Sequence, residues 1–156
     1  MKRIIEKSPF LVLFSKNSET QMDFKVLNLD GQKKILDVGC GGGGAIANFA
    51  RLGHECVGVE IHKNAAEFGS RTFGKLCSFV IADACHLPFR DRCFDIVYST
   101  EFFSHVTDVF QALSEQTRSL RKAGQLLVRD GNFLCPPYCS TYFYCILFAQ
   151  RVNMEG

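Results

Sequence analysis

A run of glycines after a short apolar segment is the first feature of the sequence that suggests ligand chemistry. The stretch DVGCGGGG (residues 37–44) separates a predicted strand from a predicted helix. Glycine has no Cβ, so such a turn lets a ligand approach the backbone closely. The run alone is ambiguous, because a G-x-G-x-x-G spacing starts at Gly39 and an acid, Glu60, follows about twenty residues later, as in dinucleotide-binding sites.

Two carboxylates narrow the choice of ligand. Asp37 precedes the glycines at the end of a strand, where it can face the ammonium group of an amino-acid ligand and would repel a pyrophosphate. Asp83 follows the third predicted strand, where the crevice of a doubly wound sheet lies. Its carboxylate can accept a hydrogen bond from an adenine amino group. The two acids therefore favour a ligand that carries both an ammonium group and an adenine.

The elements that must position these residues follow from the alternation of apolar runs and helical patterns. That alternation, from residue 34 onward, predicts a parallel sheet of right-handed βαβ units. Strands are expected at 34–38, 56–60, 79–83, 94–99 and 125–130, and helices at 45–52 and 63–73. A third helix is expected to carry Val109, Phe110, Leu113 and Leu120 and to end at Gly124. The predicted fold is α/β and Rossmann-like, doubly wound, with helices on both faces and truncated after the fifth strand.

Four segments in this order resemble the class I S-adenosylmethionine (SAM)-dependent methyltransferase family. They are ILDVGCGGG (35–43), VGVE (57–60), IADACHLPF (81–89) and FDIVYSTEFFSHVTD (94–108). The resemblance covers residues 33–130 and implies SAM as cofactor, S-adenosyl-L-homocysteine (SAH) as product, and a methyl acceptor that is a small molecule.

The resemblance also implies roles for individual residues. It implies that Asp37, Gly39 and Gly41 line the methionine part of SAM, that Glu60 accepts hydrogen bonds from both ribose hydroxyls, and that Asp83 with Ala84 holds the adenine. Ile61 would pack against the adenine face. The remaining expected cofactor contacts are Cys40, Gly43 and Ser99.

Methyl transfer from a sulfonium needs alignment of the acceptor and exclusion of water more than it needs a metal or a covalent nucleophile. A general base helps when the acceptor is a hydroxyl or a protonated amine. His105 is the candidate, because its unperturbed pKa suits proton transfer near neutrality. Loop packing or cofactor contact is its alternative role. Glu101 is expected in a solvated position, and Cys40 is expected to be a small filler.

The two ends of the chain flank this core. A single domain is expected, with an N-terminal helical cap over residues 1–33, the core over 34–130 and an apolar segment over 131–156. That segment is too short and interrupted to span a membrane, and a helix over the sheet edge is its plainest interpretation. An open fifth strand, or the apolar segment itself, would offer a homodimer contact.

Composition points away from several partners and compartments. The net charge is +2 with scattered charges, which indicates no nucleic-acid or membrane partner. Among eight cysteines, several fall inside predicted core elements, which favours a reduced, cytoplasmic protein over a disulfide scaffold. No second ligand pair accompanies Cys135 and Cys139, so no metal is expected. The start of the chain does not resemble a signal peptide.

Three functions remain open at this stage. The first is a SAM-dependent methyltransferase. The second is a non-catalytic SAM-binding regulatory subunit, or one part of a larger or dimeric methyltransferase. The third, an NAD-dependent oxidoreductase, is supported only by the glycine spacing and Glu60. No N-P-P-Y amide-recognition signature follows the fourth strand, which weakens nucleobase and glutamine acceptors.

Overall fold

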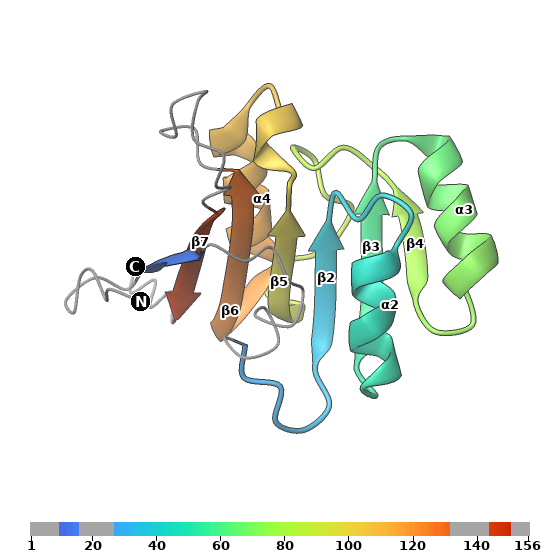
Figure 1. Ribbon diagram of the computed structural model, residues 1–156, viewed down its shortest axis with the longest axis horizontal. Helices are drawn as coiled ribbons and strands as arrows, with labels where there is room; N and C mark the ends of the chain where they lie inside the picture. Colours follow the sequence, from blue (N-terminus) through green and yellow to red (C-terminus); the bar gives the residue numbers. More distant parts are fainter. Residues whose placement is uncertain (1–9, 16–26, 132–143, 151–156) are drawn as a thin grey trace.

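A computed structural model describes residues 10–15, 27–131 and 144–150 of the chain (Figure 1). Its strands are β1 (Phe10–Ser15), β2 (Lys34–Val38), β3 (Glu55–Glu60), β4 (Ser78–Ile81), β5 (Phe94–Thr100), β6 (Leu120–Gly131) and β7 (Tyr144–Gln150). Its helices are α2 (Gly44–Arg51), α3 (Lys63–Phe73), the short 3-10 helix η1 (Phe103–His105) and α4 (Val109–Ser119).

The strands form one seven-stranded sheet in the order β1-β7-β6-β5-β2-β3-β4. The five strands from β6 to β4 are parallel, and they point upward in Figure 1. The chain starts this parallel part in the middle, at β2, winds outward to β4, and then returns to β5 on the other side of β2. The order therefore reverses between β2 and β5, and ligands bind at the carboxyl ends of the strands at such a switch point.

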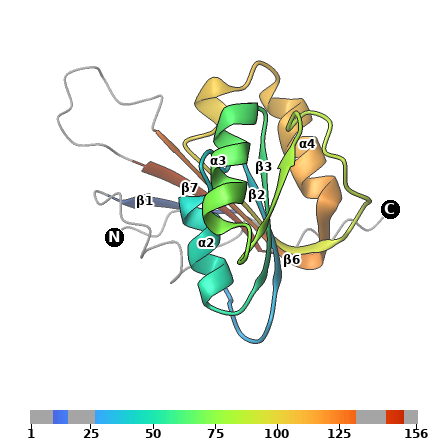
Figure 2. The same ribbon diagram turned by 90° about the vertical axis from the view of Figure 1, so that its right-hand side faces the viewer.

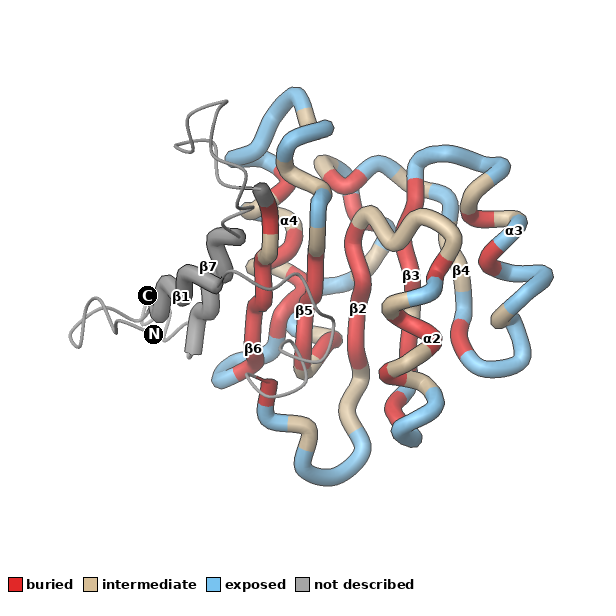
Figure 3. Tube along the Cα trace, in the orientation of Figure 1, coloured by how far each residue is buried: buried red, intermediate tan, exposed pale blue. Residues whose placement is uncertain are grey.

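Apolar side chains of the central strands pack on both faces of the sheet. Ile35 belongs to the cluster under α2, together with Phe49 of that helix, whereas Leu36 belongs to the cluster under α4. Figure 2 shows α2 and α3 on one face and α4 on the other. Figure 3 shows β2 and β5 buried along most of their length. The predicted doubly wound sheet with helices on both faces is thus confirmed.

The junction of α4 and β6 differs from the prediction. The helix ends at Ser119 instead of Gly124, because Leu120 is already extended and pairs with Phe94. The pairing resumes at Gln125 with Ile96, so residues 121–124 form a bulge. A Cβ at Gly124 would lie 2.7 Å from Leu120 Cδ1, and the glycine therefore serves this bulge and not a helix cap.

The buried face of α4 also differs from the prediction. Phe110 is 86% exposed and Val109 is exposed, so these two apolar residues do not face the core. The helix instead buries Ala112, Gln116 and Ser119, which are spaced four and three residues apart. Ala112 and Ser119 are small, whereas Gln116 is a large, fully buried side chain whose Oε1 accepts a hydrogen bond from Ser99 Oγ of β5.

Both ends of the chain contribute strands where helices were expected. The helical interpretation of the C-terminal apolar segment is wrong for Tyr144–Gln150, which forms β7 and pairs antiparallel with β6. The helical cap is wrong for Phe10–Ser15, which forms β1 and pairs antiparallel with β7. Residues 1–9, 16–26, 132–143 and 151–156 lie outside the described residues. The sheet therefore continues past its fifth parallel strand, and β6 is not the open edge on which a homodimer was expected.

His54 links the loop before β2 to the end of α2, and its environment generates a prediction about pH. The ring is buried, and its Nδ1 accepts a hydrogen bond from the Lys33 backbone N–H at 3.2 Å. Burial, followed by the nearby charge of Lys33, holds the His54 pKa below its ordinary value. The unfolded chain therefore binds this proton more readily than the folded protein does.

The free energy of unfolding should be highest above about pH 6.5 and should fall as the pH drops from there toward the lower folded pKa of His54, by at most about 1.4 kcal/mol per pH unit. His54→Asn keeps a hydrogen-bond acceptor but cannot titrate. Urea unfolding of both proteins at several pH values should therefore give a flatter pH dependence for the variant. Equal slopes would contradict this account of His54.

Candidate active site

The main crevice of the described residues lies at the carboxyl ends of the parallel strands and has a volume of about 720 Å³. Segments that follow four neighbouring strands line it, together with the start of α4. They contribute Gly39 after β2, residues 59–62 around the end of β3, 82–86 after β4, and 101–102, 105–108 and 111 after β5. The crevice thus opens at the switch point that the strand order defines.

The glycine turn contributes Gly39 to the crevice lining, and hydrogen bonds tie the turn to β3. The backbone N–H groups of Gly39 and Cys40 both donate to the Val59 carbonyl, at 2.9 and 3.0 Å. Gly39, with φ of +75°, adopts a left-handed conformation that L side chains rarely take. Gly43, with φ of +81°, does the same at the residue that precedes α2. The glycines therefore allow a tight turn whose backbone can hydrogen-bond to the end of β3.

Glu60 connects the glycine turn to the wall of the crevice. Its carboxylate is 8% exposed, and it accepts one hydrogen bond from the Gly41 N–H and one from the His62 N–H, both at 2.9 Å. Each carboxylate oxygen has a second lone pair. Glu60 can therefore accept hydrogen bonds from ligand hydroxyls while it still holds the turn.

Ile61, Asp83 and Ala84 form the next part of the wall. Ile61 is 58% exposed and offers an apolar surface to a flat ring. Asp83 Oδ1 accepts a hydrogen bond from the Cys85 N–H at 2.8 Å, and this bond is the main cause that holds the Asp83 pKa below its usual value. Asp83 thus caps a turn and also faces the crevice, and the cap is compatible with the expected contact to the adenine.

Other predicted cofactor contacts lie outside the crevice lining. Asp37 is 2% exposed, and its charge contributes to raising the pKa of the thiols of Cys40, Cys56 and Cys77, which places it among the groups near α2. Gly41 and Gly43 belong to the turn but do not line the cavity. Gly39, Glu60, Ile61, Asp83 and Ala84 are the predicted contacts that the structure brings together there.

Ser99 and Cys40 pack inside the protein and do not line the crevice. Ser99 is fully buried, with its Oγ 3.4 Å from Gln116 Oε1 of α4, because alternate side chains of β5 point to opposite faces of the sheet. It does not reach the crevice. Cys40 packs its thiol against Gly58, where a Cβ would lie 2.6 Å from Sγ. Burial, together with the charge of Asp37, raises the pKa of the Cys40 thiol, as suits a filler and not a nucleophile.

The opposite wall follows β5 and carries Glu101 and His105. Glu101 has a φ of +51°, and its N–H donates to the Arg129 carbonyl at 2.8 Å. Asp130, at the end of β6, accepts hydrogen bonds from the N–H groups of Phe103 at 2.5 Å and Ser104 at 3.3 Å. This carboxylate fixes η1 and with it His105, whose exposed side chain lines the crevice.

Phe102 and Asp130 belong to the site although the sequence did not single them out. The Phe102 ring lies against Gly39, since a Cβ there would be 2.3 Å from Phe102 Cδ2, and it meets the Phe103 ring edge-on at 5.1 Å. No sequence pattern indicated this contact between β2 and β5. The available signal for Asp130 was its place at a strand end, the same position that drew attention to Asp83.

The contact between Gly39 and Phe102 predicts a specific dependence between them. Gly39→Ala should destabilise the protein by about 2 to 4 kcal/mol, through both the positive φ and the clash with the ring. In a Phe102→Ala background the clash disappears and the cost of Gly39→Ala should fall to about 1 kcal/mol. Urea unfolding of the four proteins measures this cycle. An unchanged cost would show that the ring does not lie against Gly39.

Two other properties of the described residues bear on the chemistry. No cluster of three or more His, Cys, Asp or Glu side chains in this part of the chain is arranged to hold a metal ion. In the same residues, no helix is long and apolar enough to cross a membrane.

Comparisons with known proteins extend this picture. The family model described as "Methyltransferase domain" matches residues 36–128. Sterol 4-C-methyltransferase strm-1 of Caenorhabditis elegans is 32% identical over 109 residues, which are 67% of this chain and 33% of that protein. Methyltransferase GfsG of Streptomyces halstedii is 34% identical over 117 residues, 71% of this chain and 42% of that protein. The chain thus spans less than half the length of these two relatives.

Solved structures show the same fold. The YcgJ protein of Bacillus subtilis superposes with a TM-score of 0.68 at 28% identity, over 72% of this chain and 50% of that one. Geranyl diphosphate C-methyltransferase of Streptomyces coelicolor, solved with SAH, gives a TM-score of 0.66 at 23% identity, over 72% and 45% of the two chains. Together with the match to the family model, the order of the strands and the position of the crevice, these findings show that the chain belongs to the class I SAM-dependent methyltransferase family.

Proposed function

We propose that this chain binds SAM in the crevice and transfers its methyl group to a small-molecule acceptor. The observation that carries the proposal is the placement of Glu60, Ile61 and Asp83 around one cavity at the ends of β3 and β4. Two hydrogen-bond acceptors and one exposed apolar side chain match the ribose hydroxyls, the adenine amino group and the adenine face. The family membership reported above supports the same ligand.

The glycine turn fits the remaining part of the ligand. A Cβ at Gly41 would meet no atom within 4 Å, so the space above this residue is open. Gly39 lines the cavity nearby, and Asp37 lies near the end of β2, the strand that leads into the glycine turn. We assign Asp37, Gly39 and Gly41 to the methionine end, Glu60 to the ribose, and Ile61, Asp83 and Ala84 to the adenine. When bound, SAM supplies a methyl group activated by its sulfonium charge.

Binding of SAH tests this assignment without any knowledge of the acceptor. Calorimetric titration should show SAM and SAH binding to the protein. Glu60→Gln should weaken SAH binding at least about tenfold, because it removes one of the acceptors for the ribose and disturbs the glycine turn. Glu55→Gln is the matched control, since Glu55 starts the same strand at the far end and is exposed there. Binding of NAD without SAM or SAH would overturn the proposal.

We propose that His105 is the general base that takes a proton from the methyl-accepting substrate. It lines the crevice on the wall opposite Asp83, and the Asp130 carboxylate fixes the helix that carries it. A base at this place can take a proton from a hydroxyl or an ammonium group. If His105 instead contacts the cofactor, its replacement should weaken the binding of SAH.

His105→Gln separates these two roles. If the ring serves the acceptor, the variant should bind SAH within about twofold of the unchanged protein, a difference of less than about 0.5 kcal/mol. The Glu60→Gln variant in the same calorimetric series shows how large a true cofactor contact is. A loss of SAH affinity as large as that of Glu60→Gln would assign His105 to the cofactor.

Three expectations from the sequence stay predictions. The chain is expected to form a single domain. A homodimer is expected through an edge strand or the C-terminal apolar segment, and the outer strands of the sheet are β1 and β4, since β7 covers β6. A cytoplasmic location is supported by Cys40, Cys56, Cys77, Cys85 and Cys93, which are free thiols.

A further inference from the structure

The crevice lining carries four carboxylates and three histidines, His62, His86 and His105. Its lining includes the carboxylates of Glu60, Asp83, Glu101 and Asp108, and none of the described residues that line it is a lysine or an arginine. Charges in a cleft with low-dielectric walls reinforce one another, so their sign affects which molecules enter. The carboxylates of the lining therefore repel a phosphate or carboxylate group.

Of the four carboxylates in the crevice lining, Glu101 is the one to which neither a cofactor contact nor a helix cap is assigned. Glu60 and Asp83 are assigned to the cofactor, and Asp108 caps α4, where its Oδ1 accepts a hydrogen bond from the Gln111 N–H at 2.9 Å. Within the described residues the Glu101 carboxylate makes no hydrogen bond or ion pair, although it lines the cavity. Partial burial and the charge of Asp130 raise the Glu101 pKa, and the nearby charges of Arg129 and His105, which act in the opposite direction, do not cancel this shift.

Glu101 is held in place, and an aromatic ring lies next to it. Its backbone keeps a φ of +51° through the hydrogen bond to the Arg129 carbonyl. Strained backbone of this kind is found at functional sites. The adjacent Phe102 also lines the cavity. A carboxylate beside an aromatic ring attracts a cationic amine, by a charge-assisted hydrogen bond to one and a cation–π contact with the other.

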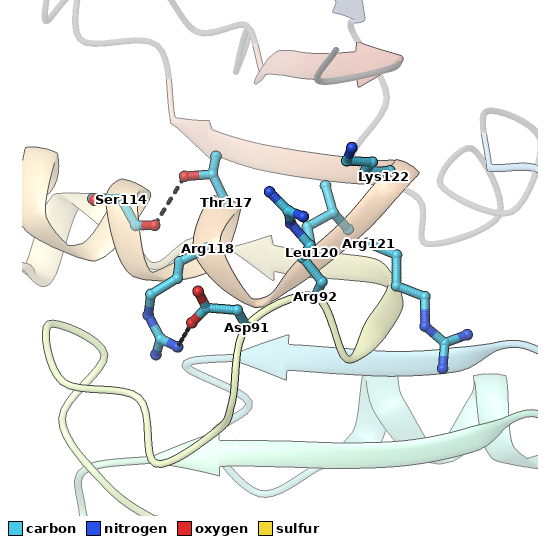
Figure 4. Close-up of a pocket in the computed structure, with 8 residues that line it drawn as sticks. All are labelled: Asp91, Arg92, Ser114, Thr117, Arg118, Leu120, Arg121 and Lys122. Carbon is cyan, nitrogen blue, oxygen red and sulfur yellow. Dashed lines mark hydrogen bonds and ion pairs between the residues drawn. The ribbon is translucent and has the colours of Figure 1, made fainter. Parts of the chain in front are cut away.

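A group of basic residues lies at the opposite end of the sheet. A smaller pocket of about 300 Å³, before the start of β5 and beside the bulge of β6, is lined by Arg92, Arg118, Arg121 and Lys122 (Figure 4). Two of these side chains pair with acids, Arg118 with Asp91 at 2.7 Å and Arg121 with Asp95 at 2.6 Å. This second pocket thus differs from the crevice, whose lining contains no lysine or arginine among the described residues.

We infer that the methyl acceptor is a small molecule that presents an amine, bound by Glu101 against Phe102, and not one that presents a phosphate or a carboxylate. The inference rests on the proposed function. The ammonium group gives its proton to His105, and the freed nitrogen lone pair attacks the methyl carbon. A nitrogen–carbon bond forms as the carbon–sulfur bond breaks, and the electron pair of the broken bond stays on sulfur to give SAH.

Three probes that share one phenylethyl group test the preference. They are phenethylamine, phenethyl alcohol and hydrocinnamate, each titrated by calorimetry into protein saturated with SAH, which lacks the sulfonium charge. The amine should bind at least about tenfold more tightly than hydrocinnamate, and the alcohol should lie between them. Glu101→Gln should weaken amine binding roughly tenfold and leave alcohol binding unchanged. Glu67→Gln is the control, because Glu67 lies on α3 outside the crevice.

The possible failures are distinct. If SAH does not bind, the proposed function itself fails. If SAH binds and the three probes have equal affinity, including the case where none binds up to its solubility limit, the inference about the acceptor is wrong while cofactor binding stands. An amine preference that survives Glu101→Gln also overturns it. Retained SAH binding by that variant shows that it is folded.

Discussion

The crevice depends on how a glycine turn without side chains is held in a single conformation. Gly39, Gly41 and Gly43 all have positive φ values, and glycine loses more conformational freedom on folding than other residues do. Two acceptors on β3 offset this cost. The Val59 carbonyl takes the N–H groups of Gly39 and Cys40, and the Glu60 carboxylate takes the N–H of Gly41. A largely buried carboxylate needs such bonds, so the turn and the acid stabilise each other.

The same device recurs around the crevice. Asp83 after β4 accepts the N–H of Cys85, and Asp130 at the end of β6 accepts the N–H groups of Phe103 and Ser104. In each case an acid at a strand end fixes the loop that begins there or beside it. Carboxylates suit this task because backbone N–H groups at such turns converge and need a strong acceptor. The walls are therefore built before any ligand arrives.

The sequence was most informative for the central strands and least for the ends. The bounds predicted for Lys34–Val38 and Lys63–Phe73 agree with the structure, because apolar patterns and the glycine turn mark them locally. The apolar segment that contains Tyr144–Gln150 has no clear period, and such a run fits a strand or a buried helix equally well. Its pairing with β6 decides the matter, and that contact is not local.

Ser99 shows a second limit of prediction from the sequence. When a strand is buried on both faces, its sequence does not reveal which face a given side chain points to. Its neighbours Ile96 and Tyr98 pack under α2, and Val97 packs under α4, so apolar residues alternate with other apolar residues. A strand of this kind reads as a continuous apolar run, and the face of any one residue is not visible in its sequence. The structure places Ser99 on the α4 side of the sheet, buried and outside the crevice lining, and this parity could not be predicted from the sequence.

The acids that build the crevice also set its electrical character. Glu60 and Asp83 are needed to hold backbone N–H groups, and each adds a negative charge to the cavity that it shapes. At the far end of the sheet, Arg118 and Arg121 pair with acids of their own. The way the loops are held therefore restricts the charge of any molecule that enters.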